Sequence, residues 1–342
     1  MELSLLLTRL CTAPGVSGRE RALHDRLIEL APTCASVERD AASNLTLTLE
    51  PSGTANRTVT LCAHADRIGF VVTDFCENGF LRVAPVGGID PRTLPASRVT
   101  VYGRETLTGI FATVPPHLQR EEDEKVYPEV DRSAIDIGLS LQQAQALVSR
   151  GDFVTLQETP AALSEHAFSA PALDNRAGCA VLLAVADRFA ENPPKSTRLV
   201  LLFSAQEELG CRGARVNRAA AVSDAVIAVD TSFSSFPGTP PEKTGTPGAG
   251  PMLGISPILS EDLTHTLQTL ARQQLLPIQS EILPGLTGTD ADVLTLFPGG
   301  EACALLSLPL KNMHSAAEIA DLRDIAACVR LLEAYLQKED LA

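Results

Sequence analysis

Four short stretches of this chain each end an apolar, strand-like run with a potential metal ligand, and a fifth stretch adds a histidine. The five stretches are HADRIGF at 64–70, ALDNRAG at 172–178, SAQEELG at 204–210, AVDTS at 228–232 and NMHSAAE at 312–318. The potential ligands in them are His64, Asp174, Glu208, Asp230 and His314, with Glu207 in addition. Carboxylates and imidazoles are the ligands that two-metal hydrolases use. The pattern therefore predicts an enzyme whose fold brings distant segments to one site.

The length of the chain predicts two hydrophobic cores. A chain of 342 residues exceeds the size at which one core usually stops growing, so we expect a large domain with a smaller one. The formal net charge of -14 argues against a nucleic-acid partner, which would need a basic face. No segment reaches the ~18 uninterrupted apolar residues that a membrane span requires. We therefore expect a soluble protein with neither a nucleic-acid nor a membrane partner.

The N-terminus and the cysteines both favour a cytoplasmic protein. In the first segment, Glu2 replaces the basic start of a signal peptide and Arg9 interrupts the apolar run, so a helix is predicted there instead. The eight cysteines are scattered and form no C-x-x-C pair. Neither a thiolate zinc site nor a disulfide framework is therefore indicated, and a reducing compartment fits best.

The N-terminal third of the chain changes character near residue 67. Ser17 and Glu20 have the spacing of a capping box before an amphipathic helix, and a strand is predicted at 57–63. From about 67 to 165, short β-rich pieces alternate with turns marked by Gly, Pro and Asn. We interpret this segment as an inserted β domain, similar to a small barrel.

The remainder of the chain alternates helix and strand. The predicted order is a buried helix at about 174–190, a strand at 198–205, a helix near 213–222, a strand at 225–230 and a last helix at about 321–337. Such alternation predicts a mainly parallel sheet with helices on both faces. The fold class is therefore α/β, with a catalytic domain formed by 1–66 and 166–342. The Pro- and Gly-rich stretch 233–256 is interpreted as a loop that shapes the site.

Ligands in open α/β sheets bind beyond the carboxyl ends of the strands, where His64, Glu207, Glu208 and Asp230 are expected. Each candidate also has an ordinary explanation on its own: Asp174 as a helix N-cap, the glutamates as exposed loop acids, and the others as turn or surface residues. Their joint arrangement favours a metal site, because every candidate is a hard or borderline ligand and none comes from the inserted segment.

These motifs resemble those of the tetrahedral, or glutamyl/deblocking, aminopeptidases of metallopeptidase family 42, which are co-catalytic dinuclear zinc enzymes. The correspondence covers nearly the whole chain, with further matching points at CTAPGVSGRE (11–20), GGIDPRTLP (87–95), PPH (115–117) and GTDAD (288–292). So many points in the same order make the resemblance highly specific.

The resemblance implies a role for each residue of the constellation. Asp174 would bridge two divalent ions, zinc or alternatively cobalt. His64 and Asp230 would complete one ion site, and Glu208 and His314 the other. Glu207 would be the general base for a hydroxide held between the ions, which attacks the N-terminal peptide bond of a substrate with a free amino terminus.

Several further residues have weaker assignments. We expect Asp66 to accept the imidazole N–H of His64 and so to fix its tautomer, and the resemblance implies a cis peptide bond at 174–175. Glu318 and Asp290 are secondary site candidates. Arg67 departs from the family, in which an acidic residue is common at this position. The other four histidines are interpreted as structural: His24, His117, His166 and His265.

The sequence thus predicts a dinuclear metal aminopeptidase acting on peptides. The resemblance implies assembly through the inserted domain into dimers and possibly a tetrahedral dodecamer. Two alternatives stay open: a metal-dependent deacylase or carboxypeptidase of the same clan, and a catalytically silent assembly subunit. A cellulase is disfavoured, because the chain has no Trp and only 4% aromatic residues for stacking sugars. The preferred N-terminal side chain, the native metal and the assembly cannot be read from the sequence.

Overall fold

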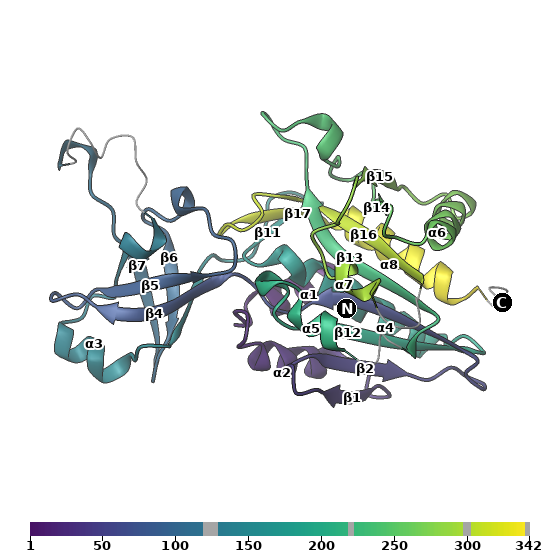
Figure 1. The fold of residues 1–342 in the computed structure, drawn as a ribbon, viewed down its shortest axis with the longest axis horizontal. Helices are drawn as coiled ribbons and strands as arrows, with labels where there is room; N and C mark the ends of the chain where they lie inside the picture. The colour runs from purple at the N-terminus through teal and green to yellow at the C-terminus, as the bar shows by residue number, and fades with distance from the viewer. Residues whose placement is uncertain (119–128, 218–221, 297–301, 339–342) are drawn as a thin grey trace.

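A computed structural model describes residues 1–118, 129–217, 222–296 and 302–338. The ribbon has two parts, a large mixed sheet with helices on its faces and a smaller barrel that projects to one side (Figure 1). The predicted α/β class with an added small barrel is confirmed. Among the described residues, no helix is long and apolar enough to cross a membrane.

The large sheet has 11 strands, and its centre is parallel. The main path of the sheet runs in the order β1 (Ser36–Arg39), β2 (Leu45–Leu49), β12 (Thr197–Ser204), β3 (Arg57–His64), β13 (Ala225–Phe233), β16 (Ala302–Lys311), β17 (Glu318–Asp321), β11 (Ala167–Ala170) and β10 (Ala161–Ala162). Two further strands, β14 (Met252–Ile255) and β15 (Gln279–Ile282), join through β16. The pairs β12–β3, β3–β13 and β13–β16 are parallel, so their carboxyl ends share one edge.

Helices cover both faces of this sheet. They are α1 (Leu3–Cys11), α2 (Arg21–Leu30), α4 (Leu173–Glu191), α5 (Arg212–Val216), α6 (Glu261–Gln273), α7 (Ala291–Leu294) and α8 (Leu322–Leu336), with short 3-10 turns η4 (Glu207–Leu209) and η6 (Pro241–Lys243). On β13, Ile227 and Val229 belong to the large hydrophobic cluster that includes α4 and α8. Val226 and Ala228 belong to a second cluster that includes α7. Since side chains alternate along a strand, Asp230 lies on the α7 face.

The smaller part is a closed six-membered antiparallel barrel, in the order β4 (Gly69–Phe75), β5 (Leu81–Val86), β8 (Ala134–Asp136), β7 (Thr106–Phe111), β6 (Arg98–Tyr102) and β9 (Phe153–Leu156). It also carries α3 (Leu141–Leu147) and the 3-10 turns η1 (Pro91–Thr93), η2 (Pro116–Leu118) and η3 (Val130–Arg132). Inside the barrel, the rings of Phe70 and Phe111 meet edge to face at 5.0 Å. The barrel therefore has its own core, separate from the sheet.

Two local predictions were wrong. Ser17 does not cap α2, which begins at Arg21 without a side-chain cap; its hydroxyl donates instead to the buried carboxylate of Asp66, while Glu20 accepts from the Gly18 amide at 2.6 Å. A carboxylate buried without hydrogen-bond donors is costly, whereas water can satisfy the free amides at an exposed helix end. The helix predicted near 213–222 ends at Val216 in the described part of the chain, and 218–221 lie outside the described residues.

Candidate metal centre

The parallel strands deliver the predicted ligands to one edge of the sheet. His64 is the last residue of β3, Asp230 lies near the end of β13, and His314 follows β16. Glu207 and Glu208 form the turn η4 just after β12, and Asp174 is in the first turn of α4. All five predicted metal ligands therefore come together, and they do so in two adjoining sets that share Asp174.

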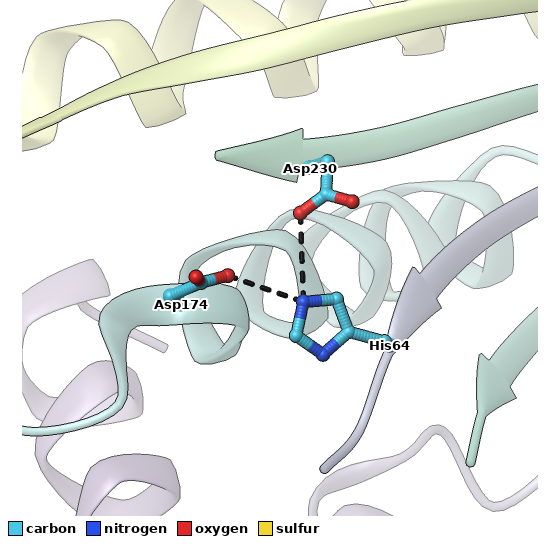
Figure 2. A group of neighbouring side chains, drawn as sticks. All are labelled: His64, Asp174 and Asp230. Atoms are coloured by element: carbon cyan, nitrogen blue, oxygen red, sulfur yellow. Dashed lines mark hydrogen bonds and ion pairs between the residues drawn. The ribbon is translucent and has the colours of Figure 1, made fainter. Parts of the chain in front are cut away.

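The first set, here the buried set, consists of His64, Asp174 and Asp230. His64 Nε2 lies 3.1 Å from Asp174 Oδ1 and 3.5 Å from Asp230 Oδ1, as Figure 2 shows. Candidate ligand atoms of the three side chains all lie within 4.8 Å of one another, and all three residues are buried. One imidazole nitrogen and two carboxylates thus converge on one point from three separate elements.

The second set, here the open set, consists of Asp174, Glu208 and His314. His314 Nε2 lies 3.2 Å from the other oxygen of Asp174, Oδ2, and 3.3 Å from Glu208 Oε1. Asp174 therefore presents one oxygen to each histidine. The His314 side chain is 32% exposed, whereas that of His64 is 2% exposed, so this set faces the outside of the molecule.

Both histidines are oriented by backbone carbonyls. The Nδ1–H of His314 donates to the Gly88 carbonyl at 2.7 Å, and that of His64 lies 3.2 Å from the Asp66 carbonyl. Because a carbonyl only accepts, each Nδ1 carries a hydrogen, and each Nε2 faces the carboxylates. Gly88 follows β5 of the barrel, so the barrel contributes to the site. A backbone acceptor leaves no side-chain signal, and the sequence interpretation missed this contact.

The Asp66 carboxylate differs in its role from the expected one. Its nearer oxygen is 3.6 Å from His64 Nδ1, beyond hydrogen-bond distance. It accepts instead from the backbone amides of Glu207 at 2.9 Å and Glu208 at 3.2 Å, and from the Ser17 hydroxyl. Asp66 therefore fixes the turn that carries the two glutamates, while its carbonyl orients His64.

Carboxylates crowd this site without enough positive charge. Burial raises the pKa of Glu207 to about 9, of Glu318 to about 8 and of Asp290 to about 6, and neighbouring carboxylates add to each shift. Burial also raises the pKa values of Glu208 and Asp230. For His314, burial lowers the pKa, but contacts with Asp174 and Glu208 outweigh it and raise the value to about 11.

The donor set fits divalent cations. Glu208 Oε1 has no hydrogen-bond partner among the described residues, although it is buried and lies near His314 Nε2. An unsatisfied buried carboxylate oxygen and a surplus of negative charge are both relieved when a cation binds. Mixed carboxylate and imidazole ligands suit zinc and cobalt. The residues present can therefore hold two such ions, one in each set.

The secondary candidates surround the ligands. Glu318 accepts from the backbone amides of Asp174 at 3.0 Å and His314 at 2.8 Å. It therefore holds in place one candidate carboxylate ligand and one candidate imidazole ligand. Asp290 lies with Glu207 and Cys211, whose thiol is 3.4 Å from Glu207 Oε1. The peptide bond between Asp174 and Asn175 is cis, which confirms the expectation from the resemblance.

The residues set aside by the sequence interpretation are not in the ligand sets. Arg67 is buried and donates to the Leu156 carbonyl in the barrel at 3.3 Å. His24 is buried in α2, and burial lowers its pKa to about 4. Neither of these nor His117, His166 or His265 is in a candidate metal group among the described residues.

A family model, similar sequences and similar solved structures all relate this chain to aminopeptidases. The family model of M42 glutamyl aminopeptidases matches residues 44–331. The lysyl aminopeptidase of Pyrococcus furiosus is 32% identical over 339 residues, 97% of this chain and 96% of that protein. An aminopeptidase of Desulfurococcus kamchatkensis superposes with a TM-score of 0.89 at 26% identity, covering 98% of this chain and 94% of that one. The TET1 peptidase of Pyrococcus horikoshii gives 0.84 at 29% identity, covering 98% and 99%.

Proposed function

The chain belongs to the M42 glutamyl aminopeptidase family, and from that premise we propose that it is a dinuclear metal aminopeptidase with Glu207 as its general base. Membership makes it a peptidase, a metal-dependent hydrolase of peptide bonds. The observation that carries the finer proposal is the sharing of Asp174, whose two oxygens face His64 and His314 separately. A carboxylate placed in this way can bridge two ions.

We assign one metal ion to each of the two sets. His64 and Asp230 hold one ion with Asp174, and Glu208 and His314 hold the other. When bound, the ions supply Lewis-acid polarisation of the scissile carbonyl and lower the pKa of water. Zinc is our first assignment and cobalt the second, because both accept mixed oxygen and nitrogen ligands.

The chain's own residues supply the proton transfer and the positioning. Glu207 is presented by η4 and held there through its amide by Asp66. Its carboxylate takes a proton from the attacking water and returns it to the departing amine. Burial and the neighbouring acids raise the pKa of Glu207 to about 9 when no cation offsets them. Cations that offset this effect lower the pKa of Glu207 toward neutral pH, where a carboxylate can both accept and release a proton.

The alternatives make different predictions about substrates. A deacylase or carboxypeptidase with the same ligands would cleave N-acylated or C-terminal amides, and would not need a free amino terminus. A silent assembly subunit would have no reason to keep five ligands and Glu207 in one place. The aminopeptidase names of the relatives favour release from a free amino terminus.

The decisive test replaces Glu207 with Gln. We expect Glu207→Gln to bind as much zinc as the wild type and to lose roughly 10²- to 10⁴-fold in kcat on an aminoacyl p-nitroanilide, because only the proton transfer is removed. Glu242→Gln, an equal charge change on the exposed turn η6, is the control. Full activity of Glu207→Gln would exclude it as the base, and an inert metal-loaded wild type would support the silent subunit.

We also propose that the chain self-associates, with the segment 67–165 as a contact region. The support is by likeness alone: the P. horikoshii TET1 peptidase is described as assembling into a tetrahedron or a large octahedral shell. Light scattering of the zinc-loaded protein tests this proposal, since a dimer and a dodecamer differ sixfold in mass. A monomer would contradict it.

A further inference from the structure

Glu281 forms an unusual contact beside the metal centre. It lies on β15, and its two carboxylate oxygens accept separate hydroxyl hydrogen bonds from two other strands. Ser232 of β13 donates to Oε1 at 2.5 Å, and Ser307 of β16 donates to Oε2 at 2.6 Å. The carboxylate is therefore held in a fixed position over the sheet, and neither the family match nor the ligand sets give it a role.

The two serines place Glu281 next to the metal ligand Asp230. Ser307 is the residue paired with Asp230 across the parallel strands β13 and β16. Ser232 follows Asp230 by two residues on the same strand, so its side chain is on the same face about 6.6 Å farther along. The Glu281 carboxylate therefore lies on the face of the sheet that holds the metal centre, displaced toward the carboxyl ends of the strands.

Among the described residues, no cationic side chain balances the charge of this carboxylate. Among the residues that the structure describes, its hydrogen-bond partners are the two hydroxyls, and no lysine, arginine or histidine forms an ion pair with it. Glu281 and Ser232 are both partly exposed residues, so this contact is not sealed within the core. A carboxylate has about four acceptor positions, and two hydroxyl bonds leave room for a further donor.

We propose that Glu281 selects peptides whose first residue is lysine or arginine, by accepting the cationic end of that side chain. The assignment rests on the proposed aminopeptidase function, in which the first residue of the peptide is held at the metal centre. From there, the long flexible stem of lysine or arginine spans a separation of the order found between Asp230 and Ser232. A cation placed here gains a charge-assisted hydrogen bond, whereas an acidic side chain meets a fixed like charge.

Two other roles for Glu281 make distinguishable predictions. A carboxylate that only links three strands would contribute to stability and would leave substrate preference unchanged. A carboxylate that binds the α-amino group would affect all substrates alike, because every one of them carries that group. Selection of the side chain alone changes the ratio between substrates.

The experiment compares kcat/KM for lysyl, leucyl and glutamyl p-nitroanilides on zinc-loaded protein. We expect the wild type to prefer the lysyl substrate, and Glu281→Gln to lower the lysyl-to-leucyl ratio by roughly 30-fold with the leucyl value little changed. The ratio is measured within one preparation, so it does not depend on the fraction of folded enzyme. Ser232→Ala removes one of the two anchors and should lower the same ratio less.

Glu242→Gln, with the same loss of charge on an exposed turn, should keep the wild-type ratio and is the matched control. An unchanged ratio in Glu281→Gln would overturn the proposal, and so would a uniform loss on all three substrates. A wild type that cleaves leucyl or glutamyl substrates better than lysyl ones would overturn the Glu281 assignment alone. A metal-loaded wild type that cleaves none of the three would instead contradict the proposed function.

Discussion

The two sets of the proposed metal centre share Asp174 but differ in how the fold holds them. The buried set takes His64 and Asp230 from the ends of neighbouring parallel strands, with both side chains almost fully covered. The open set takes Glu208 and His314 from a short turn and a loop, and the His314 ring is one-third exposed. His64 and Asp230 are each fixed by a ladder to a neighbouring strand, through Ser204 and Ser307, whereas turns depend on a few specific contacts.

The geometry of each set has a different source. The position of His64 follows from the pairing of β3 with β12, in which His64 is opposite Ser204. The position of His314 depends on the Gly88 carbonyl and on Glu318, one from the barrel side and one from β17. We therefore expect the buried set to behave as part of the core and the open set to behave as an adjustable site.

The largest expected effect comes from the residue that belongs to both sets. Asp174→Asn keeps the shape but offers only one acceptor oxygen and no negative charge. We expect both ions to be lost together and peptidase activity to fall to background, as measured by metal content after gel filtration and by hydrolysis of an aminoacyl p-nitroanilide. Asp262→Asn, an exposed acid in the first turn of α6, is the control. Retention of one full equivalent of zinc would contradict the shared role.

The two histidines are expected to differ in what their removal costs. His64→Ala leaves Asp174 and Asp230 buried without their imidazole partner, so we expect the free energy of unfolding of the metal-free protein to fall by about 3 kcal/mol. His314→Ala removes a partly exposed ring, so its main effect should be on metal affinity. Urea unfolding and zinc titration of both variants measure the contrast. Equal destabilisation by the two changes would remove the distinction between the sets.

The sequence predicted the candidate ligands better than the residues that support them. Strand periodicity and the rule that ligands collect at carboxyl ends were enough to expect His64, Asp230 and the two glutamates together. The resemblance, rather than periodicity, supplied the bridging role of Asp174 and the cis bond after it. The supports were not predictable in the same way: the hydroxyl of Ser17 was assigned to a helix cap and in fact binds Asp66. Such contacts depend on which buried acceptor lies nearby, and local sequence does not contain that information.

A smaller effect is expected from the Asp66 side chain, which holds the turn that carries Glu207 and Glu208. Asp66→Asn puts an NH₂ group that cannot accept in place of one carboxylate oxygen: either Oδ1, which accepts from the Glu207 amide, or Oδ2, which accepts from the Glu208 amide and the Ser17 hydroxyl. We expect a 10- to 100-fold loss of metal affinity or activity, roughly the range for outer partners of metal ligands. Ser17→Ala should lose less, because the two amide bonds persist. A normal affinity for both ions in Asp66→Asn would show that the η4 turn holds its shape without this carboxylate.

The smallest effect isolates the contribution of the barrel to the open set. A Cβ at Gly88 would lie 3.3 Å from His314 Nδ1 and 3.6 Å from its Cε1, and the backbone at Gly88 is not in the left-handed region. Gly88→Ala should therefore displace the His314 ring by a few tenths of an ångström while the hydrogen bond to the Gly88 carbonyl persists. The affinity of the open set for zinc should fall by less than the ~10-fold expected when an outer partner is lost outright. Gly285→Ala, where a Cβ meets nothing within 4 Å, is the matched control. The ion of the buried set should bind normally in both variants, since among the described residues no hydrogen bond or ion pair joins His64 or Asp230 to this segment. Weaker binding of both ions would mean that the two sets respond as one rigid unit.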